Sequence, residues 1–574
     1  MIELHGAAAA RPPLVVLKFG SSVLRDRACL PEVVSEIYRI VRTGRRVIAV
    51  TSAFAGVTDA LMRESLATGC AHDNVNAPAY IATGEEVSAA LVAMACDRSG
   101  LCSIALKAPE LGIRADGDPQ DATPTALEAA ILNAALDAHD VVVVPGFVAT
   151  DASGRTVLLG RGGSDLTAVF LAHALGAERV RLVKDVDGVY DRDPAEAKGA
   201  LRFEQIDWRG AGEVAGRLLQ TRALDFAAAR GVVVEVGEIG SDEATIIADK
   251  AKPPAFRARP PKLRVALAGY GVVGAGVAQR LLARPDAFEL ASVLVRDGEK
   301  SREGALPRAL FTTDRDAFLD ADADVVVDVL SDARAGAGLS AEALRRGVDV
   351  VSANKQALIG SHDVLTQLAA THGARLLHSA AVGGGAPLLE AVAAARGGAP
   401  IAMIEGVLNG TVNFILERLA MGQTFEEALR AAQAAGLAEA DPSADLSGAD
   451  ALAKLRLISI AAFGVASCDV CVEPLTQHIA AHAGRERLKQ VARIVREADA
   501  LRGGIVFERA EGSAFADLHG DRNGVRIVTA DGRVHTARGR GAGRWPTTES
   551  VFADLVDLRS ARLSAAEEGM KVAV

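Results

Sequence analysis

The sequence is poor in cysteine, with 6 among 574 residues. They are scattered and lack the dense spacing of a disulfide-stabilised secreted domain. One Cys-x-x-Cys pair, Cys468 and Cys471, has no second pair and no histidine pair to complete a zinc site, so we interpret it as packing rather than redox chemistry. We assign no metal site. Scarce cysteine is typical of a reducing compartment, and we expect a cytoplasmic protein.

The chain also lacks a long apolar run, a leader pattern and an excess of basic residues. No uninterrupted apolar stretch approaches the roughly 18 residues that a membrane-spanning helix needs. The start, MIELHGAAAARPP, has no basic region, and its alanine run ends in Arg11 and two prolines. Acidic residues outnumber basic ones by 73 to 63, a net charge of −10. Because an acidic surface repels phosphates, we expect no nucleic-acid and no membrane partner.

Length and hydrophobic patterning indicate an α/β protein with more than one core. Half of the residues are hydrophobic, and 574 residues exceed what one core usually holds. Apolar runs such as residues 14–19, 46–50 and 141–147 alternate with Ala- and Leu-rich helical segments. This alternation predicts an α/β domain with a mostly parallel sheet over residues 14–247. Residues 248–262 carry two Pro-Pro pairs and are predicted to be a linker.

A second α/β pattern follows the linker. Residues 263–392 again alternate strand-like and helical runs, which predicts a dinucleotide-binding domain. From residue 393 to 562 the helical patterns lengthen and mix with short strands, so we expect an α+β domain there. Within it, GVRIVTADGRVHTARG is typical of a β-hairpin, because a turn sequence separates two alternating runs.

The second domain opens on a Gly-x-Gly-x-x-Gly motif formed by Gly269, Gly271 and Gly274. It lies directly between a strand-like run and a helical one, where glycines allow a tight turn, close approach to a pyrophosphate and close helix packing. The next strand ends at Arg296, where NAD-binding proteins usually carry an acid. A guanidinium there suits a 2′-phosphate and favours NADP. The alternative is that Arg296 is a solvated surface charge, and NAD remains possible.

Two lysines in this half lie in chemically suggestive surroundings. Lys355 follows a predicted strand in SANKQAL, and Lys454 ends the acid-rich stretch GLAEADPSADLSGADALAKL. Asp450 and Lys454 are four residues apart, so they share one face of a helix. Carboxylates can hold the ammonium of a small amino acid while a lysine delivers a proton to an alkoxide. A helix cap and an i,i+4 ion pair are the structural alternative.

These motifs resemble homoserine dehydrogenase. They are GYGVVGAG, SANKQAL, AVGGGAP, GVLNGTVNFIL, the acid-rich stretch and GRGAGRWPTTESVFADL, in that order over residues 263–555. The resemblance implies reduction of aspartate 4-semialdehyde to homoserine with NADPH or NADH. It places the substrate at Glu439, Asp445 and Asp450, the carbonyl oxygen and its proton at Lys355 and Lys454, the junction with the cofactor at Thr411 and Asn413, and the return to the nucleotide domain at Gly543.

One position departs from that family. Its usual acidic residue four positions before the Gly-rich turn contributes to a monovalent-cation site, and this chain carries Ser379 there. A neutral hydroxyl binds sodium far less well than a carboxylate. We therefore doubt the cation site more than the hydride transfer.

The N-terminal half carries three Gly- or acid-rich turns that follow predicted strands. They begin at Lys18 in KFGSS, at Gly160 in GRGGSDLTA and at Lys184 in KDVDGVYDRDP. A lysine beside a Gly/Ser turn can clamp charge on a transferring phosphoryl group. None of the three is a Walker P-loop, so a different kinase design is predicted.

These turns, with VTSAFAGVTD and ATGEEVSAAL, resemble aspartate kinase of the amino-acid kinase superfamily over about residues 14–247. The resemblance implies formation of aspartyl 4-phosphate from aspartate and ATP with Mg²⁺. It places aspartate at Thr58, Glu85 and Arg161, the phosphoryl site at Lys18 and Asp165, and the nucleotide at Gly20, Ser21, Lys184, Asp185 and Tyr190.

The kinase motifs also depart from the family pattern. Ser21 replaces a glycine, Arg217 stands at a lysine position, and Ala195 replaces an arginine. Lys184, where the family often has threonine, is a candidate to compensate.

The leading interpretation is a bifunctional aspartate kinase and homoserine dehydrogenase without the ACT regulatory domains usual in such kinases. We therefore expect insensitivity to threonine and lysine, and a homodimer formed through the dehydrogenase half. One alternative is a monofunctional dehydrogenase whose degenerate kinase-like half is a binding module. Another is the same two chemistries on an analogue substrate.

Overall fold

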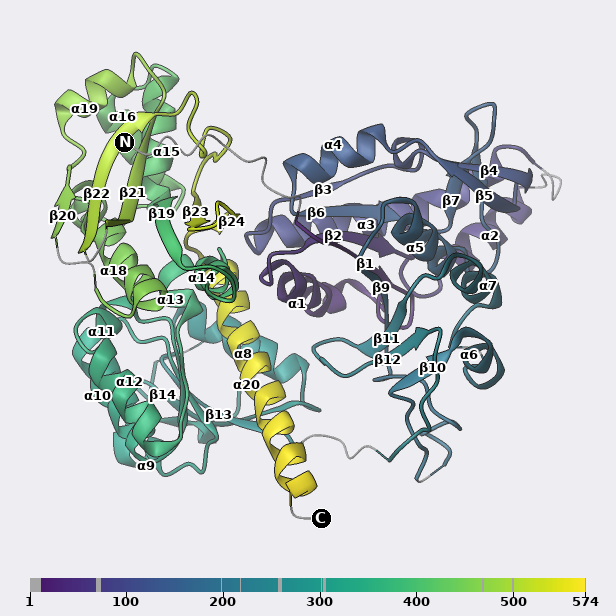
Figure 1. Ribbon diagram of the computed structural model, residues 1–574, viewed down its shortest axis with the longest axis horizontal. Helices are drawn as coiled ribbons and strands as arrows, with labels where there is room; N and C mark the ends of the chain where they lie inside the picture. Colours follow the sequence, from purple (N-terminus) through teal and green to yellow (C-terminus); the bar gives the residue numbers. More distant parts are fainter. Residues whose placement is uncertain are drawn as a thin grey trace. The chain divides into compact units, whose positions relative to one another are not determined.

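The computed structural model describes residues 12–68, 74–197, 199–216, 218–256, 261–300, 302, 306–466, 469–497 and 500–572. Cys468 and Arg217, singled out from the sequence, lie outside these residues. The chain divides into two compact units, which are described separately: Pro12–Val41 with Arg45–Arg259, and a unit built mainly from Pro260–Val574 (Figure 1). The expected fold class, α/β domains followed by an α+β domain, is confirmed.

The first unit is built on an eight-stranded sheet. Its central strands are parallel, and only β11 and β12 pair in antiparallel fashion. In spatial order the strands are β10 (Gln205–Asp207), β12 (Thr245–Ala248), β11 (Val234–Glu238), β9 (Arg179–Lys184), β1 (Leu14–Phe19), β2 (Arg46–Thr51), β6 (Val141–Pro145) and β3 (Ser103–Ala105). Because β9, β1 and β2 are neighbours and parallel, the turns that follow them meet at one edge of the sheet.

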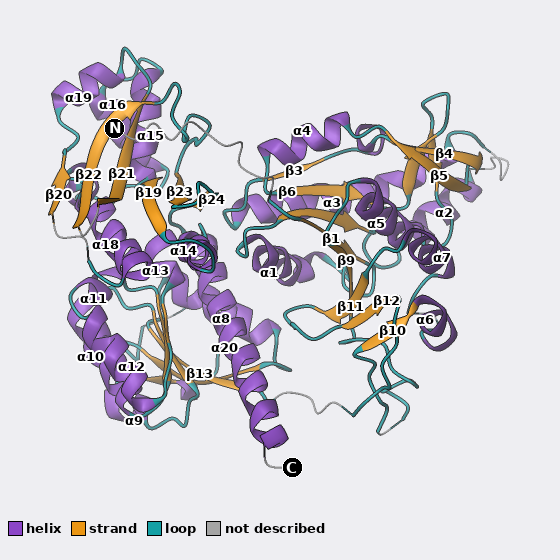
Figure 2. Ribbon diagram, viewed as in Figure 1, coloured by secondary structure: helices purple, strands orange, loops and turns teal. Residues whose placement is uncertain are grey.

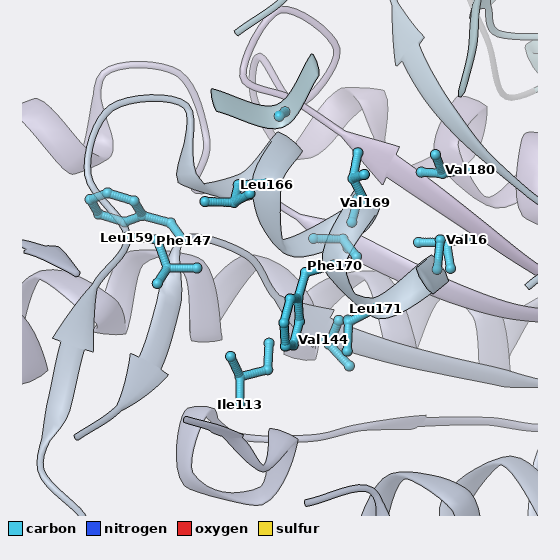
Figure 3. Close-up of a cluster of buried hydrophobic side chains, with 14 of the residues drawn as sticks. Val16, Ile113, Val144, Phe147, Leu159, Leu166, Val169, Phe170, Leu171 and Val180 are labelled. Atoms are coloured by element: carbon cyan, nitrogen blue, oxygen red, sulfur yellow. The ribbon is translucent and has the colours of Figure 1, made fainter. Parts of the chain in front are cut away.

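Helices flank this sheet, and a small second sheet extends it. The helices are α1 (Leu30–Val41), α2 (Val57–Ala67), α3 (Ala77–Arg98), α4 (Ala130–Ala138), α5 (Gly163–Ala174), α6 (Trp208–Val214) and α7 (Thr221–Arg230). The small sheet has the order β5 (Asp121–Leu127), β4 (Ile113–Asp118), β7 (Val148–Thr150) and β8 (Thr156–Leu158). Figure 3 shows the core beneath α5, where Leu166, Val169 and Phe170 join Val16 and Val144 of the sheet in one buried cluster.

Helix α1 is held to the sheet partly by buried charge. Glu36 is fully buried and accepts hydrogen bonds from the backbone N–H of Gly240 at 2.8 Å and from the Arg39 guanidinium at 3.4 Å. Arg181 of β9 pairs with the other carboxylate oxygen at 3.2 Å. Burial alone would raise the pKa of Glu36, but Arg39 and Arg181 outweigh it and keep that pKa below its ordinary value.

Helix α3 is the one helix among the described residues that is long and apolar enough to cross a membrane. Half of its apolar window is buried inside the unit, where it packs against α1, α2 and β6. Its middle carries Glu85 and Ser88, both buried. Such a pattern is typical of a helix that packs in the core of an α/β domain.

The second unit begins with a six-stranded, fully parallel sheet. Its order is β15 (Phe311–Thr312), β14 (Phe288–Leu294), β13 (Leu263–Ala268), β16 (Val325–Asp328), β17 (Asp349–Ser352) and β18 (Leu376–Leu377). The order reverses between β13 and β16, which is where doubly wound sheets bind ligands. Helices cover both faces (Figure 2): α8 (Val272–Ala283), α9 (Arg315–Leu319), α10 (Ala333–Arg345), α11 (Lys355–Ile359) and α12 (His362–His372).

A second, mixed sheet of six strands forms the rest of this unit. Its order is β20 (Asp469–Val472), β22 (Ala500–Arg509), β21 (Leu488–Glu497), β19 (Ile401–Val407), β23 (Arg522–Thr529) and β24 (Val534–Arg540). The hairpin predicted from the sequence is β23–β24, and Gly532 in its turn has a φ of 82°. The helices are α13 (Ser379–Gly383), α14 (Leu388–Arg396), α15 (Gly410–Ala420), α16 (Phe425–Ala434), α17 (Ser443–Leu446), α18 (Ala449–Phe463) and α19 (Gln477–Ala483).

The last helix, α20 (Arg544–Val572), returns to the parallel sheet and packs against α8. A Cβ on Gly276 would lie 2.4 Å from the hydroxyl oxygen of Thr548, so only glycine allows this approach. One turn further along α8, Arg280 is buried and donates to the carboxylate of Glu549. The guanidinium of Arg280 also lies 5.3 Å from the ring centroid of Trp545.

Candidate functional site

Three charged side chains converge in the first unit, at the ends of β1 and β9 and in the first turn of α5. The Nζ atom of Lys18 lies 2.7 Å from one carboxylate oxygen of Asp165, and the Nζ atom of Lys184 lies 3.3 Å from the other. All three side chains are at least nine-tenths buried. Burial would raise the pKa of Asp165, but the two ammonium groups outweigh it and lower that pKa. The cluster therefore carries one positive charge more than negative, which suits a phosphate.

The Gly/Ser turn after β1 lies against this cluster. A Cβ on Gly20 would stand 2.7 Å from the Nζ atom of Lys18, so a larger residue would displace the ammonium. Ser21 and Ser22 are exposed beside it. At the same edge of the sheet, the hydroxyl of Ser52, which follows β2, donates to the hydroxyl of Ser164 at 3.1 Å. The structure thus joins the three turns singled out from the sequence.

Thr58 and Glu85 form a second polar pair in the first unit. Glu85 accepts from the hydroxyl of Thr58 at 3.1 Å and from the backbone N–H of Ala53 at 3.4 Å. Its second carboxylate oxygen is buried without a hydrogen-bond partner among the described residues. Burial raises the pKa of Glu85 to about 7. An unpaired buried carboxylate is a natural acceptor for a ligand's ammonium.

The remaining predicted residues of this half are more exposed. Arg161 is exposed in a turn between Gly160 and Gly162, whose φ values of 71° and 78° favour glycine. Asp185 is exposed immediately after β9. The hydroxyl of Tyr190 donates to the carboxylate of Asp187 at 2.7 Å, which ties the ring to its own loop.

The Gly-rich turn of the second unit has the form that a dinucleotide requires. Gly269 has a φ of 102°, and a Cβ on Gly274 would stand 2.1 Å from the carbonyl oxygen of Gly269. By contrast, a Cβ on Gly271 would meet nothing within 4 Å. Gly271 is the N-cap of α8 and has no capping side chain, so the first N–H groups of the helix face an open approach. These residues fit a pyrophosphate.

Two more predicted cofactor residues border this turn. Arg296 lies just beyond β14 and is exposed. Gly543, with a φ of 119°, directly precedes α20. The segment around it packs tightly, since a Cβ on Gly384 would lie 2.3 Å from the carbonyl oxygen of Gly541.

One charge cluster of the second unit joins Lys355 of α11 to Asp450 and Lys454 of α18. Lys355 forms an ion pair with one carboxylate oxygen of Asp450, and Lys454 approaches the other at 3.0 Å. Lys454 is buried and also donates to the carbonyl oxygen of Leu408 at 2.8 Å. Burial opposes ionisation of Asp450, but Lys454 and Lys355 dominate and keep its pKa below the ordinary range. The carboxylate thus fixes both ammonium groups.

Asn409, which the sequence analysis did not select, connects this cluster to Asp445. Its side-chain nitrogen lies 2.7 Å from Asp445 Oδ1 and 3.1 Å from Asp450 Oδ2. Burial raises the pKa of Asp445, the hydrogen bond from Asn409 lowers it, and the charge of Asp450 raises it. The signal in the sequence was an asparagine directly before a predicted helix, which is also the signature of a simple N-cap.

Two residues predicted at the cofactor junction are engaged elsewhere. Asn413 is fully buried, and its amide bonds Lys489 Nζ and the carbonyl oxygens of Leu518 and Gly520. The placement of Asn413 at the cofactor junction therefore stays a prediction, and these contacts give the side chain a structural role. The hydroxyl of Thr411 donates to the carbonyl oxygen of Leu437.

The second unit contains two further acidic residues that bear on the site, Glu439 and Asp328. Glu439 is exposed in the loop between α16 and α17. Asp328, which the sequence analysis also missed, ends β16 at the switch point of the parallel sheet and is fully buried. Burial raises its pKa to about 6. Among the described residues, no group of three or more His, Cys, Asp or Glu side chains could hold a metal ion.

Family models and similar proteins match both halves of the chain. Three family models match: "Amino acid kinase family" over residues 13–238, "Homoserine dehydrogenase, NAD binding domain" over 269–379, and "Homoserine dehydrogenase" over 387–556. A homoserine dehydrogenase of Synechocystis sp. is 34% identical over 319 residues, covering 52% of this chain and 73% of that protein. An aspartokinase of Helicobacter pylori is 31% identical over 238 residues, covering 41% of this chain and 59% of that protein.

A crystal structure of a homoserine dehydrogenase from Thiobacillus denitrificans is also similar, with 27% identity and a TM-score of 0.48. The alignment covers 53% of this chain and 74% of that one. The sequence matches confirm the two resemblances drawn from the motifs. The chain spans less than two thirds of the aspartokinases that it matches.

Proposed function

The chain belongs to the homoserine dehydrogenase family, and from that premise we propose that it reduces aspartate 4-semialdehyde to homoserine in its second unit and phosphorylates aspartate in its first. The observation that carries the dehydrogenase is the cluster of Lys355, Asp450 and Lys454, with Asp445 beside it. It combines a carboxylate for the substrate's ammonium with two fixed ammonium groups for a developing alkoxide.

A nicotinamide cofactor held at the Gly-rich turn of Gly269, Gly271 and Gly274 would supply a hydride for the aldehyde carbon. Asp445 receives the substrate's ammonium. Lys454 and Lys355 place positive charge at the aldehyde oxygen, and Lys454 gives it a proton as the alkoxide forms. Asp450 fixes both lysines in orientation, because its carboxylate pairs with each of them.

We propose NADP as the preferred cofactor. The open Gly271 surface at the start of α8 receives the pyrophosphate, and exposed Arg296 pairs with the 2′-phosphate. The proposal includes no monovalent cation, because Ser379 offers a hydroxyl where the family has a carboxylate.

The first unit is proposed to use ATP with Mg²⁺. Lys18 and Lys184 bind oxygens of the transferring phosphoryl group, while Asp165 keeps both ammonium groups at one place. Lys184 thereby supplies a positive charge in place of the arginine that the family pattern has where this chain has Ala195. Glu85, with Thr58 and Arg161, holds aspartate, and its unpaired oxygen receives the amino group.

The test is a pair of assays on the full chain: aspartate- and ATP-dependent hydroxamate formation, and oxidation of NADPH or NADH by aspartate semialdehyde. We expect turnover in both and a higher kcat/KM with NADPH. Lys18→Met is expected to lower the hydroxamate rate by roughly 10²- to 10³-fold, since it removes one donor to the phosphoryl oxygens. The same preparation should oxidise NADPH at the wild-type rate, which controls for folding.

The second candidate is a dehydrogenase whose first unit only binds ATP. The substitution at Ser21 favours it, because a side chain stands where the kinase pattern has glycine. NADPH oxidation with no hydroxamate above background, together with measurable binding of a fluorescent ATP analogue, would establish this alternative and refute the kinase reaction.

The raised pKa of Glu85 predicts how the kinase responds to pH. Only the ionised carboxylate attracts the ammonium of aspartate, and its pKa of about 7 is above the ordinary glutamate value. The kcat/KM for aspartate should therefore be highest above pH 7 and fall as the pH drops through about 7.

Glu85→Gln tests this assignment. It should lower kcat/KM roughly tenfold to a hundredfold and remove the fall near neutral pH. An unchanged pH profile in this variant would show that another group titrates.

We propose that the protein is a homodimer formed through the dehydrogenase half, and that it acts in the cytoplasm on small-molecule substrates. The acidic net charge and the scarcity of cysteine support a reducing, nucleic-acid-free setting.

A further inference from the structure

The amide of Asn409 is held in one orientation by the backbone. Asn409 is the N-cap of α15, and its side-chain oxygen accepts the N–H of Val412 at 2.8 Å. With the oxygen fixed there, the NH₂ group must face the opposite way, toward Asp445 and Asp450. Asn409 is 2% exposed, so solvent does not compete for these bonds. Every hydrogen-bonding group of this side chain thus has a partner.

We propose that Asn409 is a positioning residue of the dehydrogenase site, and that its NH₂ group holds the carboxylate of Asp445 beside the cluster of Asp450, Lys355 and Lys454, where Asp445 receives the substrate's ammonium. The inference rests on the proposed reduction of an amino aldehyde. It deepens that proposal by assigning a role to a residue that does not itself touch the reacting atoms.

The charges around Asp445 explain why its carboxylate needs the hydrogen bond from Asn409. Asp445 lies in a partly buried place where the neighbouring charge of Asp450 disfavours its ionisation. Lys454, from the same helix as Asp450, and Lys355 of α11 favour it. Both lysines, however, are paired to Asp450. The hydrogen bond from Asn409 is therefore the direct contact that stabilises the Asp445 carboxylate.

Two substitutions distinguish the hydrogen bonds from Asn409 to Asp445 and Asp450 from its role as the N-cap of α15. Serine and aspartate are both good N-caps, so Asn409→Ser and Asn409→Asp should preserve the start of α15. Asn409→Ser removes the two amide donors. Asn409→Asp keeps the shape of the side chain but places a third carboxylate beside the other two.

The experiment measures kcat and KM for aspartate semialdehyde from about pH 5 to about pH 9 in wild type and both variants. We expect kcat/KM to fall roughly tenfold to a hundredfold in Asn409→Ser, mainly through KM, and further in Asn409→Asp. The acid limb of the profile should move to higher pH, because Asp445 loses the hydrogen bond that lowers its pKa. Hydroxamate formation should stay at the wild-type value in both variants, and the melting temperature should stay closer to wild type in Asn409→Ser than in Asn409→Asp, which buries a third carboxylate.

The experiment distinguishes failure of this inference from failure of the proposed function. If wild type oxidises NADPH and Asn409→Ser retains both the wild-type kcat/KM and the wild-type acid limb, Asn409 acts only as a helix cap and the inference is overturned. If wild type itself does not reduce the aldehyde, the proposed function fails, and the inference falls with it because no ammonium substrate remains to be positioned.

Discussion

Lys454→Met should lower the kcat of NADPH-dependent aldehyde reduction by roughly 10²- to 10⁴-fold, the range for loss of a positioned proton donor. Methionine matches the length of the lysine stem but carries no proton to give. Asp450 stays paired with Lys355 in this variant, so the neighbouring carboxylates keep one counter-charge. KM for the aldehyde should change little, because Asp445 still receives the ammonium. Steady-state rates at saturating NADPH measure both quantities.

The first unit supplies an internal control for this variant. Hydroxamate formation should be unchanged, which shows that the chain is folded and active elsewhere. If KM rises while kcat stays at the wild-type value, Lys454 binds the substrate and another group delivers the proton. Lys355→Met, which removes the more exposed lysine of the cluster, then becomes the informative comparison.

The largest expected effect on stability comes from Glu36→Gln in α1. The substitution removes the fully buried carboxylate shared by Arg39 and Arg181, whose remaining carboxylate partners, Asp242 and Glu235, are more exposed. Arginine cannot escape by losing its proton, so the free energy of unfolding of the first unit should fall by about 3–5 kcal/mol. The midpoint of heat inactivation of the kinase should drop by roughly 10 °C. Hydrogen exchange of the α1 amides gives a second, activity-independent measure.

Glu178→Gln is the matched control, because Glu178 pairs with Arg45 and Arg179 but its side chain is 35% exposed. We expect a change below about 1 kcal/mol. Heat inactivation of NADPH oxidation should be unaffected by either substitution. Equal losses of stability in Glu36→Gln and Glu178→Gln would contradict the claim that burial sets the effect.

The sequence predicted the architecture well because strand and helix periodicities are local signals. The hairpin β23–β24 follows from alternating residues around a turn, and the Gly-rich turn follows from glycines between a strand and a helix. The pair of Asp450 and Lys454 follows from helical spacing alone. Its contact with Lys355, 95 residues away, required either the family resemblance or the fold.

Side-chain partners across the fold were harder to foresee. Asn409 and Asn413 are both amides in the same motif, yet one faces the carboxylates and the other is buried against Lys489. The two residues are four positions apart, so helical geometry places them on the same side. Tertiary packing then decides which residues each side chain contacts. Buried Glu36 illustrates the same limit, because its arginine partner Arg181 comes from a distant strand.

Helix α20 makes the dinucleotide-binding part of this protein discontinuous in the sequence. Its strands and α8 come from residues 263–377, whereas the carboxylate that neutralises Arg280 comes from Glu549, 269 positions later. A fragment that stopped after β24 would keep every strand but leave that guanidinium unpaired against an uncovered face of α8. Truncation after β24 is therefore expected to expose α8 and to destabilise the dinucleotide-binding part, although all of its strands would be present.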